Sequence, residues 1–133
     1  MVERDVEAHL RGVAKRYPVV VVLGPRQSGK TTLCRRVFAG KPYVSLEDPD
    51  TREFARSDPR GFLARYPGGA VLDEVQRVPE LPSYLQTLVD AQRKRGLFVL
   101  AGSENLALTE RVSQSLAGRA ALVTLLPLTL GEA

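Results

Sequence analysis

The chain has 133 residues, 44% of them hydrophobic, which suits one domain with a core of its own. Its net charge of +4 leaves a nucleic-acid partner open, although Lys and Arg are spread along the chain. The single cysteine, Cys34, excludes a disulfide framework, and no apolar run approaches the roughly 20 residues of a membrane span. The charged N-terminus does not resemble a signal peptide, so we expect a cytoplasmic protein without a membrane partner.

The first predicted element is an amphipathic helix over residues 3–16. Apolar residues recur there at helical spacing, with charged residues between them. We expect this helix to pack against the domain that follows.

A buried strand over residues 19–23 runs into a glycine-bounded loop and then a helix from Thr31 to about Phe38. Gly24, four further residues and Gly29-Lys30-Thr31 form the pattern G-x-x-x-x-G-K-[ST], in which backbone N–H groups cradle phosphate. Lys30 is expected to reach the β- and γ-phosphates, and Thr31 to bind Mg²⁺. The candidate nucleotide-binding residues are Gly24, Pro25, Arg26, Gln27, Ser28, Gly29, Lys30, Thr31 and Thr32. The alternative is a glycine-rich turn with a surface lysine.

The next region predicts structure but no chemistry. A short strand is expected over residues 43–46, and two short helices between residues 47 and 69. Asp48-Pro49 and Asp58-Pro59 have the pattern of helix starts. The aromatic residues in this segment are most simply core.

An apolar strand over residues 70–72 ends in Asp73-Glu74, the second informative site. Asp73 is expected to hold Mg²⁺, directly or through water, and Glu74 to polarise the attacking water as general base. The alternative is a solvated strand end. Downstream of a phosphate loop, the functional interpretation is favoured.

A helix from Leu81 leads to the basic triplet Arg93-Lys94-Arg95 and then Gly96. This is ordinary chemistry for a helix end, and an anionic partner stays open. The strand over residues 97–101 then runs into polar residues. Of these, Ser103 and Asn105 are candidates for orienting water and contacting the γ-phosphate, or equally for capping the next helix.

Arg119 follows the next helix, which ends at Gly118, and precedes a final strand over residues 121–126. It could act on the γ-phosphate of a neighbouring subunit, or only cap the helix. Alternation of strands and helices predicts an α/β fold with a mainly parallel sheet and helices on both faces. Ligand should lie at the carboxyl ends of the strands, where the three candidate sites converge.

Four segments together resemble the AAA-type ATPase domain of a widespread prokaryotic family. They are Gly24 to Leu33, Leu72 to Leu81, Ala101 to Leu106 and Ser115 to Arg119. The resemblance implies a P-loop NTPase sandwich with strand order 5-1-4-3-2, and it makes Ser103 to Asn105 the sensor and Arg119 an arginine finger. Glu104 departs from the small polar residue usual in that family.

In that family the ATPase domain usually continues into a C-terminal region described as nuclease-like. This chain is expected to be one ATPase core over residues 1–133, without the helical lid or that region. Hydrolysis by such a core is expected to be slow.

The leading functional hypothesis is an ATP-binding, Mg²⁺-dependent ATPase module that couples nucleotide state to an attached domain or partner. The alternative is a nucleotide-gated binding module with negligible hydrolysis and a protein or DNA partner. A small-molecule kinase is the third hypothesis, disfavoured by the Asp-Glu pair. ATP is preferred to GTP because no guanine-reading segment occurs. Whether the chain forms a homo-oligomer stays open.

Overall fold

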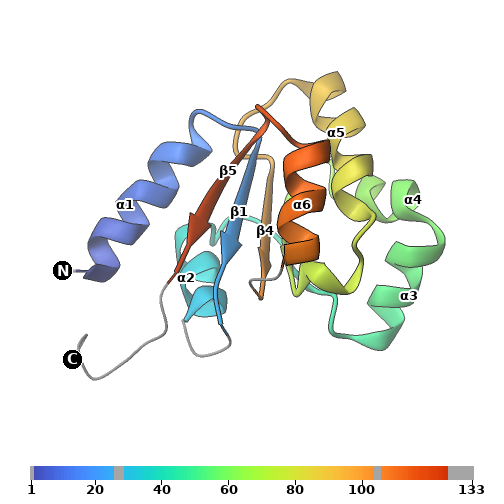
Figure 1. Ribbon diagram of the computed structural model, residues 1–133, viewed down its shortest axis with the longest axis horizontal. Helices are drawn as coiled ribbons and strands as arrows, with labels where there is room; N and C mark the ends of the chain where they lie inside the picture. The colour runs from blue at the N-terminus through green and yellow to red at the C-terminus, as the bar shows by residue number, and fades with distance from the viewer. Residues whose placement is uncertain (1, 26–28, 104–105, 126–133) are drawn as a thin grey trace.

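Five parallel strands form the centre of the computed structural model (Figure 1). The structure describes residues 2–25, 29–103 and 106–125, and it describes the side chains of all of these except 2–4 and 106. The strands lie in the order β2-β3-β4-β1-β5, which confirms the predicted order read from the other edge. They are β1 (Val19–Leu23), β2 (Tyr43–Ser45), β3 (Ala70–Asp73), β4 (Phe98–Gly102) and β5 (Ala120–Thr124).

Six α-helices and a short 3-10 helix in the described residues connect or flank these strands. They are α1 (Val2–Ala14), α2 (Lys30–Val37), α3 (Pro49–Ser57), α4 (Pro59–Ala64), η2 (Val75–Arg77), α5 (Leu81–Gln92) and α6 (Leu106–Ser115). Asp48 and Asp58 accept N-cap hydrogen bonds from Thr51 N and Gly61 N, as their Asp-Pro patterns predict. Within the described residues, no helix has the length and apolar character needed to cross a membrane.

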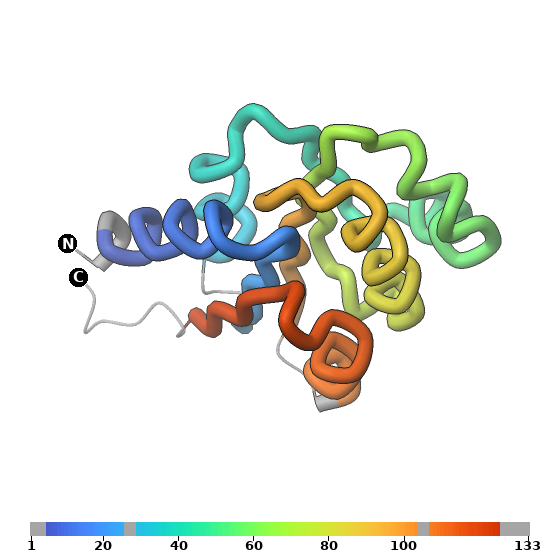
Figure 2. The backbone as a smooth tube through the Cα atoms, turned by 90° about the horizontal axis from the view of Figure 1, so that it is seen from above, coloured from blue at the N-terminus to red at the C-terminus, as the bar shows by residue number. Residues whose placement is uncertain are grey.

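The central strand β1 is buried on both faces, so its residues alternate between two cores. Val19, Val21 and Leu23 pack with the core beneath α5 and α6, whereas Val20 and Val22 pack with α1 and α2. Figure 1 shows α1 and α2 on one side of the sheet and α3 to α6 on the other, and Figure 2 shows the same division from above. This three-layer arrangement confirms the predicted fold class.

Several element boundaries differ from those predicted, most of them by one or two residues. The first helix begins at Val2 and ends at Ala14, and the final strand is Ala120–Thr124. Helix α5 ends at Gln92, with Arg93 in the left-handed conformation at φ 56°. The basic triplet therefore follows the last turn of the helix and forms a loop.

Candidate functional site

The turn from β1 into α2 leaves the sheet at its carboxyl end and provides the first part of the site. Gly29 is the N-cap of α2 and has φ 79°, a backbone conformation that favours glycine. It directs the first turn of α2, and with it Lys30, toward the end of β3. Arg26, Gln27 and Ser28 lie outside the described residues, so the loop interior is not part of this geometry.

Lys30 is buried, with only 2% of the residue exposed. Its Nζ lies 3.7 Å from Glu74 Oε2, and that carboxylate is also largely sheltered from solvent. A charge removed from water needs an opposite charge or hydrogen bonds to remain ionised. The pairing with Glu74 meets part of this need for the ammonium.

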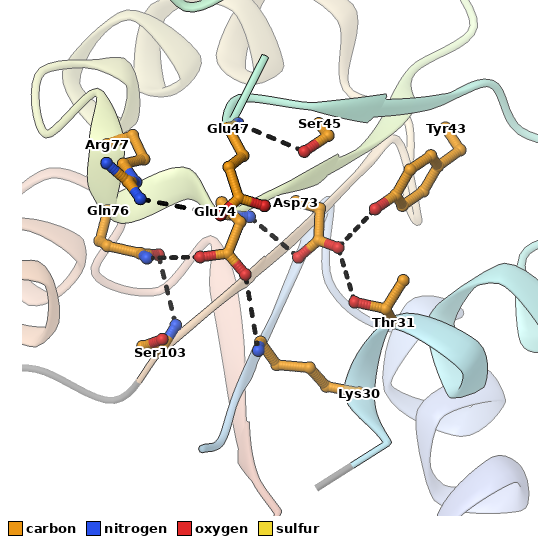
Figure 3. Close-up of polar contacts among 10 residues, drawn as sticks. All are labelled: Lys30, Thr31, Tyr43, Ser45, Glu47, Asp73, Glu74, Gln76, Arg77 and Ser103. Atoms are coloured by element: carbon orange, nitrogen blue, oxygen red, sulfur yellow. Dashed lines mark hydrogen bonds and ion pairs between the residues drawn. The ribbon is translucent and has the colours of Figure 1, made fainter. Parts of the chain in front are cut away.

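Asp73 ends β3 and is as deeply buried as Lys30, with 2% exposed. Three donors reach its carboxylate (Figure 3): Thr31 Oγ1 at 2.7 Å and Tyr43 OH at 2.6 Å donate to Oδ2, and the Glu74 backbone N–H donates to Oδ1 at 2.9 Å. The aspartate is thereby held in one orientation by two neighbouring elements, α2 and β2.

Glu74 has the left-handed conformation, with φ 56° and ψ 42°. For a residue other than glycine this costs about 1–2 kcal/mol, and such conformations concentrate at functional sites. The turn lets successive residues place both carboxylates at the same end of the sheet, Asp73 toward Thr31 and Glu74 toward Lys30 (Figure 3).

Gln76 connects Glu74 to the neighbouring strand. Its Nε2 donates to Glu74 Oε1 at 2.7 Å, and its Oε1 accepts from the Ser103 backbone N–H at 3.3 Å (Figure 3). Ser103 directly follows β4. The side-chain amide therefore links the carboxyl ends of β3 and β4 through the carboxylate of Glu74.

Sequence reasoning missed Tyr43 and Gln76 as members of this site. Tyr43 begins β2, where an aromatic residue is ordinary, and Gln76 stands in a short polar segment. Burial, followed by the hydrogen bond to Asp73, raises the pKa of the Tyr43 phenol, so it stays a donor at neutral pH. A polar residue two positions after Glu74, beyond the apolar Val75, was the one available signal for Gln76.

The structure places the remaining predicted residues differently. The backbone of Ser103 joins the network, whereas Asn105 lies outside the described residues. Arg119 lies at the amino end of β5, five strand residues, or about 16 Å, away from the site. There it donates to both carboxylate oxygens of Asp90, at 2.6 and 2.9 Å. Arg119 therefore does not contribute to the phosphate loop of its own chain.

The residues present fit a nucleotide with a divalent cation. The N-terminus of α2 and the buried Lys30 ammonium suit an anion. Thr31 and Asp73 supply a hydroxyl and a carboxylate oxygen, the hard ligands that Mg²⁺ takes. The described residues contain no group of three or more His, Cys, Asp and Glu side chains that could form an all-protein metal cage. This fits Mg²⁺, which is usually held by one or two protein ligands together with phosphate and water.

Comparisons with solved structures define the class as a P-loop NTPase fold. The P-loop NTPase domain of a sigma-54 transport activator from E. coli aligns over 95% of this chain and 95% of its own length, with 18% identity and a TM-score of 0.55. A DNA replication initiation factor aligns over 91% of this chain and 44% of its own, with 17% identity and a TM-score of 0.58. PCH-2 of C. elegans covers 96% and 43%, with 15% identity and a TM-score of 0.57.

The chain belongs to the AAA domain family, whose model matches residues 16–133. It is a nucleotide-binding, ATPase-like module. It is also 40% identical over 130 residues to an uncharacterized protein of Mycobacterium bovis and to one of Mycobacterium tuberculosis. The match covers 97% of this chain but 30% of each relative.

Proposed function

We propose that this chain is an ATP-binding, Mg²⁺-dependent ATPase module whose nucleotide state is passed to an attached domain or partner. The observation that carries the proposal is the meeting of Lys30, Thr31, Asp73 and Glu74 at the carboxyl ends of β1 and β3. The site combines a buried cation, a helix N-terminus and two carboxylates in different surroundings. This combination suits the binding and cleavage of a phosphate chain, and a purely structural role would not require it.

The binding roles follow from position. In this proposal the glycine-bounded loop and the N-terminus of α2 hold the phosphates, and Lys30 exchanges its contact with Glu74 for the β- and γ-phosphates. Thr31 and Asp73 hold Mg²⁺, for which their mutual hydrogen bond of 2.7 Å has to open or rearrange. Bound Mg²⁺ would neutralise charge on the phosphates. Tyr43 keeps its hold on Asp73 and so fixes the orientation of the carboxylate.

Glu74 is proposed as the general base. When Lys30 turns to the phosphates, Glu74 Oε2 is released, while Gln76 still holds Oε1 at 2.7 Å. The free oxygen can then accept a proton from the attacking water. Gln76 acts as a positioning residue, because it reaches the reaction only through Glu74 and the Ser103 backbone.

Two further residues belong to the proposal without a geometric place in this chain's own site. Asn105 is proposed to orient the water as the sensor. Arg119 is proposed to act on the nucleotide of a neighbouring copy, which requires a homo-oligomer and release of its two hydrogen bonds to Asp90. The longer relatives have room for an attached domain, and the nuclease-like C-terminal region implied by the resemblance is our proposal for it.

The test compares Glu74→Gln with the unchanged chain. Titration calorimetry with ATP and Mg²⁺ should give similar affinities, while phosphate release should fall about 10²- to 10⁴-fold, the usual worth of a general base. Glu80→Gln is the matched control, since Glu80 is exposed and pairs with Arg111 at 3.8 Å outside the site. If Glu74→Gln released phosphate as fast as the unchanged chain, Glu74 would not be the general base.

One observation favours a second candidate, a nucleotide-gated binding module with negligible hydrolysis. Both oxygens of Glu74 are engaged, Oε1 by Gln76 at 2.7 Å and Oε2 near Lys30 at 3.7 Å, so the base is not free in this arrangement. Tight ATP binding with phosphate release no faster than in buffer would favour this candidate over the ATPase. Release that depends on Glu74 would exclude it.

A further inference from the structure

A basic cavity lies at the amino ends of the strands, the end of the sheet opposite Lys30 and Asp73. Its volume is about 410 Å³, and its lining residues are Arg16, Pro18, Val89, Asp90, Arg93, Lys94 and Arg95. Four of the seven carry a positive charge, and all four of these side chains are exposed. Of the lining residues, only Asp90 enters the proposed ATPase, as the hydrogen-bond partner of Arg119.

Two segments distant in the sequence bring these charges together. Arg16 belongs to the connection between α1 and β1, and the other three form the loop between α5 and β4. The two connections are held side by side by backbone hydrogen bonds, from Gly96 N to Tyr17 O and from Leu97 N to Pro18 O, both 2.8 Å. The two backbone segments that carry the cations are therefore hydrogen-bonded to each other, and all four side chains are exposed.

The positive charge of this basic cavity is not neutralised from within. Arg16, Lys94 and Arg95 form no ion pair with any of the residues that the structure describes. The one acidic lining residue, Asp90, accepts two hydrogen bonds from Arg119 at 2.6 and 2.9 Å. That guanidinium keeps the pKa of Asp90 below its ordinary value, so the carboxylate stays ionised and paired with Arg119. An anionic ligand would meet three cations without an ion-pair partner among the described residues, beside Arg93, whose charge also acts on Asp90.

We propose that the basic cavity binds the phosphodiester backbone of a nucleic acid. Three of its four cations are arginines, whose planar guanidinium groups donate paired hydrogen bonds to phosphate oxygens. Pro18 is partly exposed and adds a small apolar surface to the lining, which can contact the less polar sugar next to a phosphate. The contacts are to the backbone, so binding is independent of base sequence and strongly dependent on salt.

The cavity and the nucleotide site can be occupied at the same time. Strand β1 separates them, with Val19 at the end near the basic cavity and Leu23 at the end that leads to the phosphate loop. Nucleic acid would therefore bind without displacing nucleotide. ATP and nucleic acid are titrated separately. A negative result for nucleic-acid binding would therefore leave the proposed ATPase untouched, and the reverse also holds.

The test measures the fluorescence anisotropy of a labelled duplex of about 20 base pairs, at low salt, with the full 133-residue chain. The double variant Arg16→Glu with Arg95→Glu should bind at least about tenfold more weakly. The control is Arg60→Glu with Arg65→Glu, an equal change of charge on exposed residues of and beside α4, each stacked over an aromatic ring. It should change affinity less than about twofold.

The salt dependence of duplex binding gives a second measurement. It uses a single substitution of an exposed residue, so it stays informative if the double variant folds poorly. The single substitution Lys94→Ala should reduce the slope of log K against log salt by about 0.9, the value for one lost phosphate contact. Thermal unfolding and an ATP titration of each variant report whether the fold and the other site are intact.

Three results would overturn the proposal. One is no binding of the duplex at low salt, and another is equal weakening in the control double variant. The third is displacement of the labelled duplex by poly-glutamate as effective as that by unlabelled duplex, which would assign the cavity to acidic proteins instead.

Discussion

The two ends of the central sheet treat charge in opposite ways. At the carboxyl end, Lys30 and Asp73 are each 2% exposed and contact an opposite charge or several donors. At the amino end, the cations around the basic cavity are exposed, and three of them have no ion-pair partner among the described residues. The same sheet thus carries one closed and one open charged site.

Hydration explains the difference. A buried charge loses its water, so each must be compensated inside the protein before any ligand arrives. An exposed charge keeps its water and needs no partner, which leaves it available to a polyanion at little cost to folding. The closed site suits a small ligand that replaces internal partners one by one, and the open site suits a large ligand attracted by net charge.

Lys30→Ala should have the largest effect and should be confined to the carboxyl end. Loss of the ammonium is expected to weaken ATP binding about 100-fold, the worth of a strong charge-assisted contact. Duplex binding should be unchanged. Titration calorimetry and anisotropy on the same sample measure the two ends separately.

Lys41→Ala is the matched control for that substitution. Its Nζ donates to Gly68 O at 3.0 Å, and both residues precede the strands that they lead into, away from Asp73. ATP affinity should therefore stay within about twofold. An equal loss in both variants would mean that general charge, and not the buried lysine, binds the nucleotide.

Gly96→Ala should damage the opposite end instead. Gly96 has φ +62°, and an added Cβ would lie 2.9 Å from Ala14 O, so the tie between the two basic segments would be strained. We expect the free energy of unfolding to fall by about 1–3 kcal/mol, with a weaker hold on duplex and unchanged ATP affinity in the folded fraction. Urea denaturation measures the stability change.

Gly40→Ala provides the reference for the glycine substitution. No atom lies within 4 Å of the Cβ that it would add, and its φ is not positive. Its stability should stay within about 0.5 kcal/mol of the unchanged chain. Comparable destabilisation in both variants would contradict the role given to Gly96.

Tyr43→Phe should sharpen the comparison by removing one compensating donor from the closed site. Asp73 would lose the 2.6 Å hydrogen bond that helps to orient it. Such supporting contacts to metal ligands are worth about tenfold, so Mg²⁺-dependent ATP affinity should fall by about that factor. Calorimetry with Mg²⁺ and with EDTA isolates the metal-dependent part; a loss of equal size in EDTA would assign Tyr43 to folding alone. Tyr66→Phe is the control.

The smallest effect is expected at the pair formed by Asp90 and Arg119. Because Arg119 depresses the pKa of Asp90, the pair stabilises the fold above the unfolded-state pKa of about 3.9 and loses that contribution as pH falls through the lower folded value. In Arg119→Ala, the titration midpoint of Asp90 followed by NMR should rise. An unchanged midpoint would show that the pair does not form in solution.

Much of the fold could be predicted because its signals are local. The apolar runs that became β1, β3 and β4 were recognisable as strands, and the Asp-Pro patterns marked the starts of α3 and α4. The predicted end of α5 was wrong. The sequence pattern favoured a termination at Gly96, whereas the helix ends at Gln92 and Arg93 has a left-handed conformation. The loop that follows is hydrogen-bonded to the α1 to β1 connection through Gly96 and Leu97.

The candidate site divides in the same way. Glycine spacing and an acidic pair after a strand were enough to single out Lys30, Thr31, Asp73 and Glu74, and the structure brings these side chains together. Their assignment to nucleotide and metal binding stays a prediction. Tyr43 and Gln76 could not be found, because a tyrosine in a strand and a glutamine in a polar segment have no distinctive local pattern.

The sequence by itself determined the layered α/β fold and singled out Lys30, Thr31, Asp73 and Glu74, because these signals depend on periodicity and spacing over a few neighbouring residues. Only the tertiary structure decided which residues compensate the buried charges, at which end of the sheet Arg119 lies, and that Arg16 joins the basic triplet around one cavity. Those contacts join residues far apart in the chain. They are set by which strands are neighbours and which loops meet at each end, and these are properties of the packed whole.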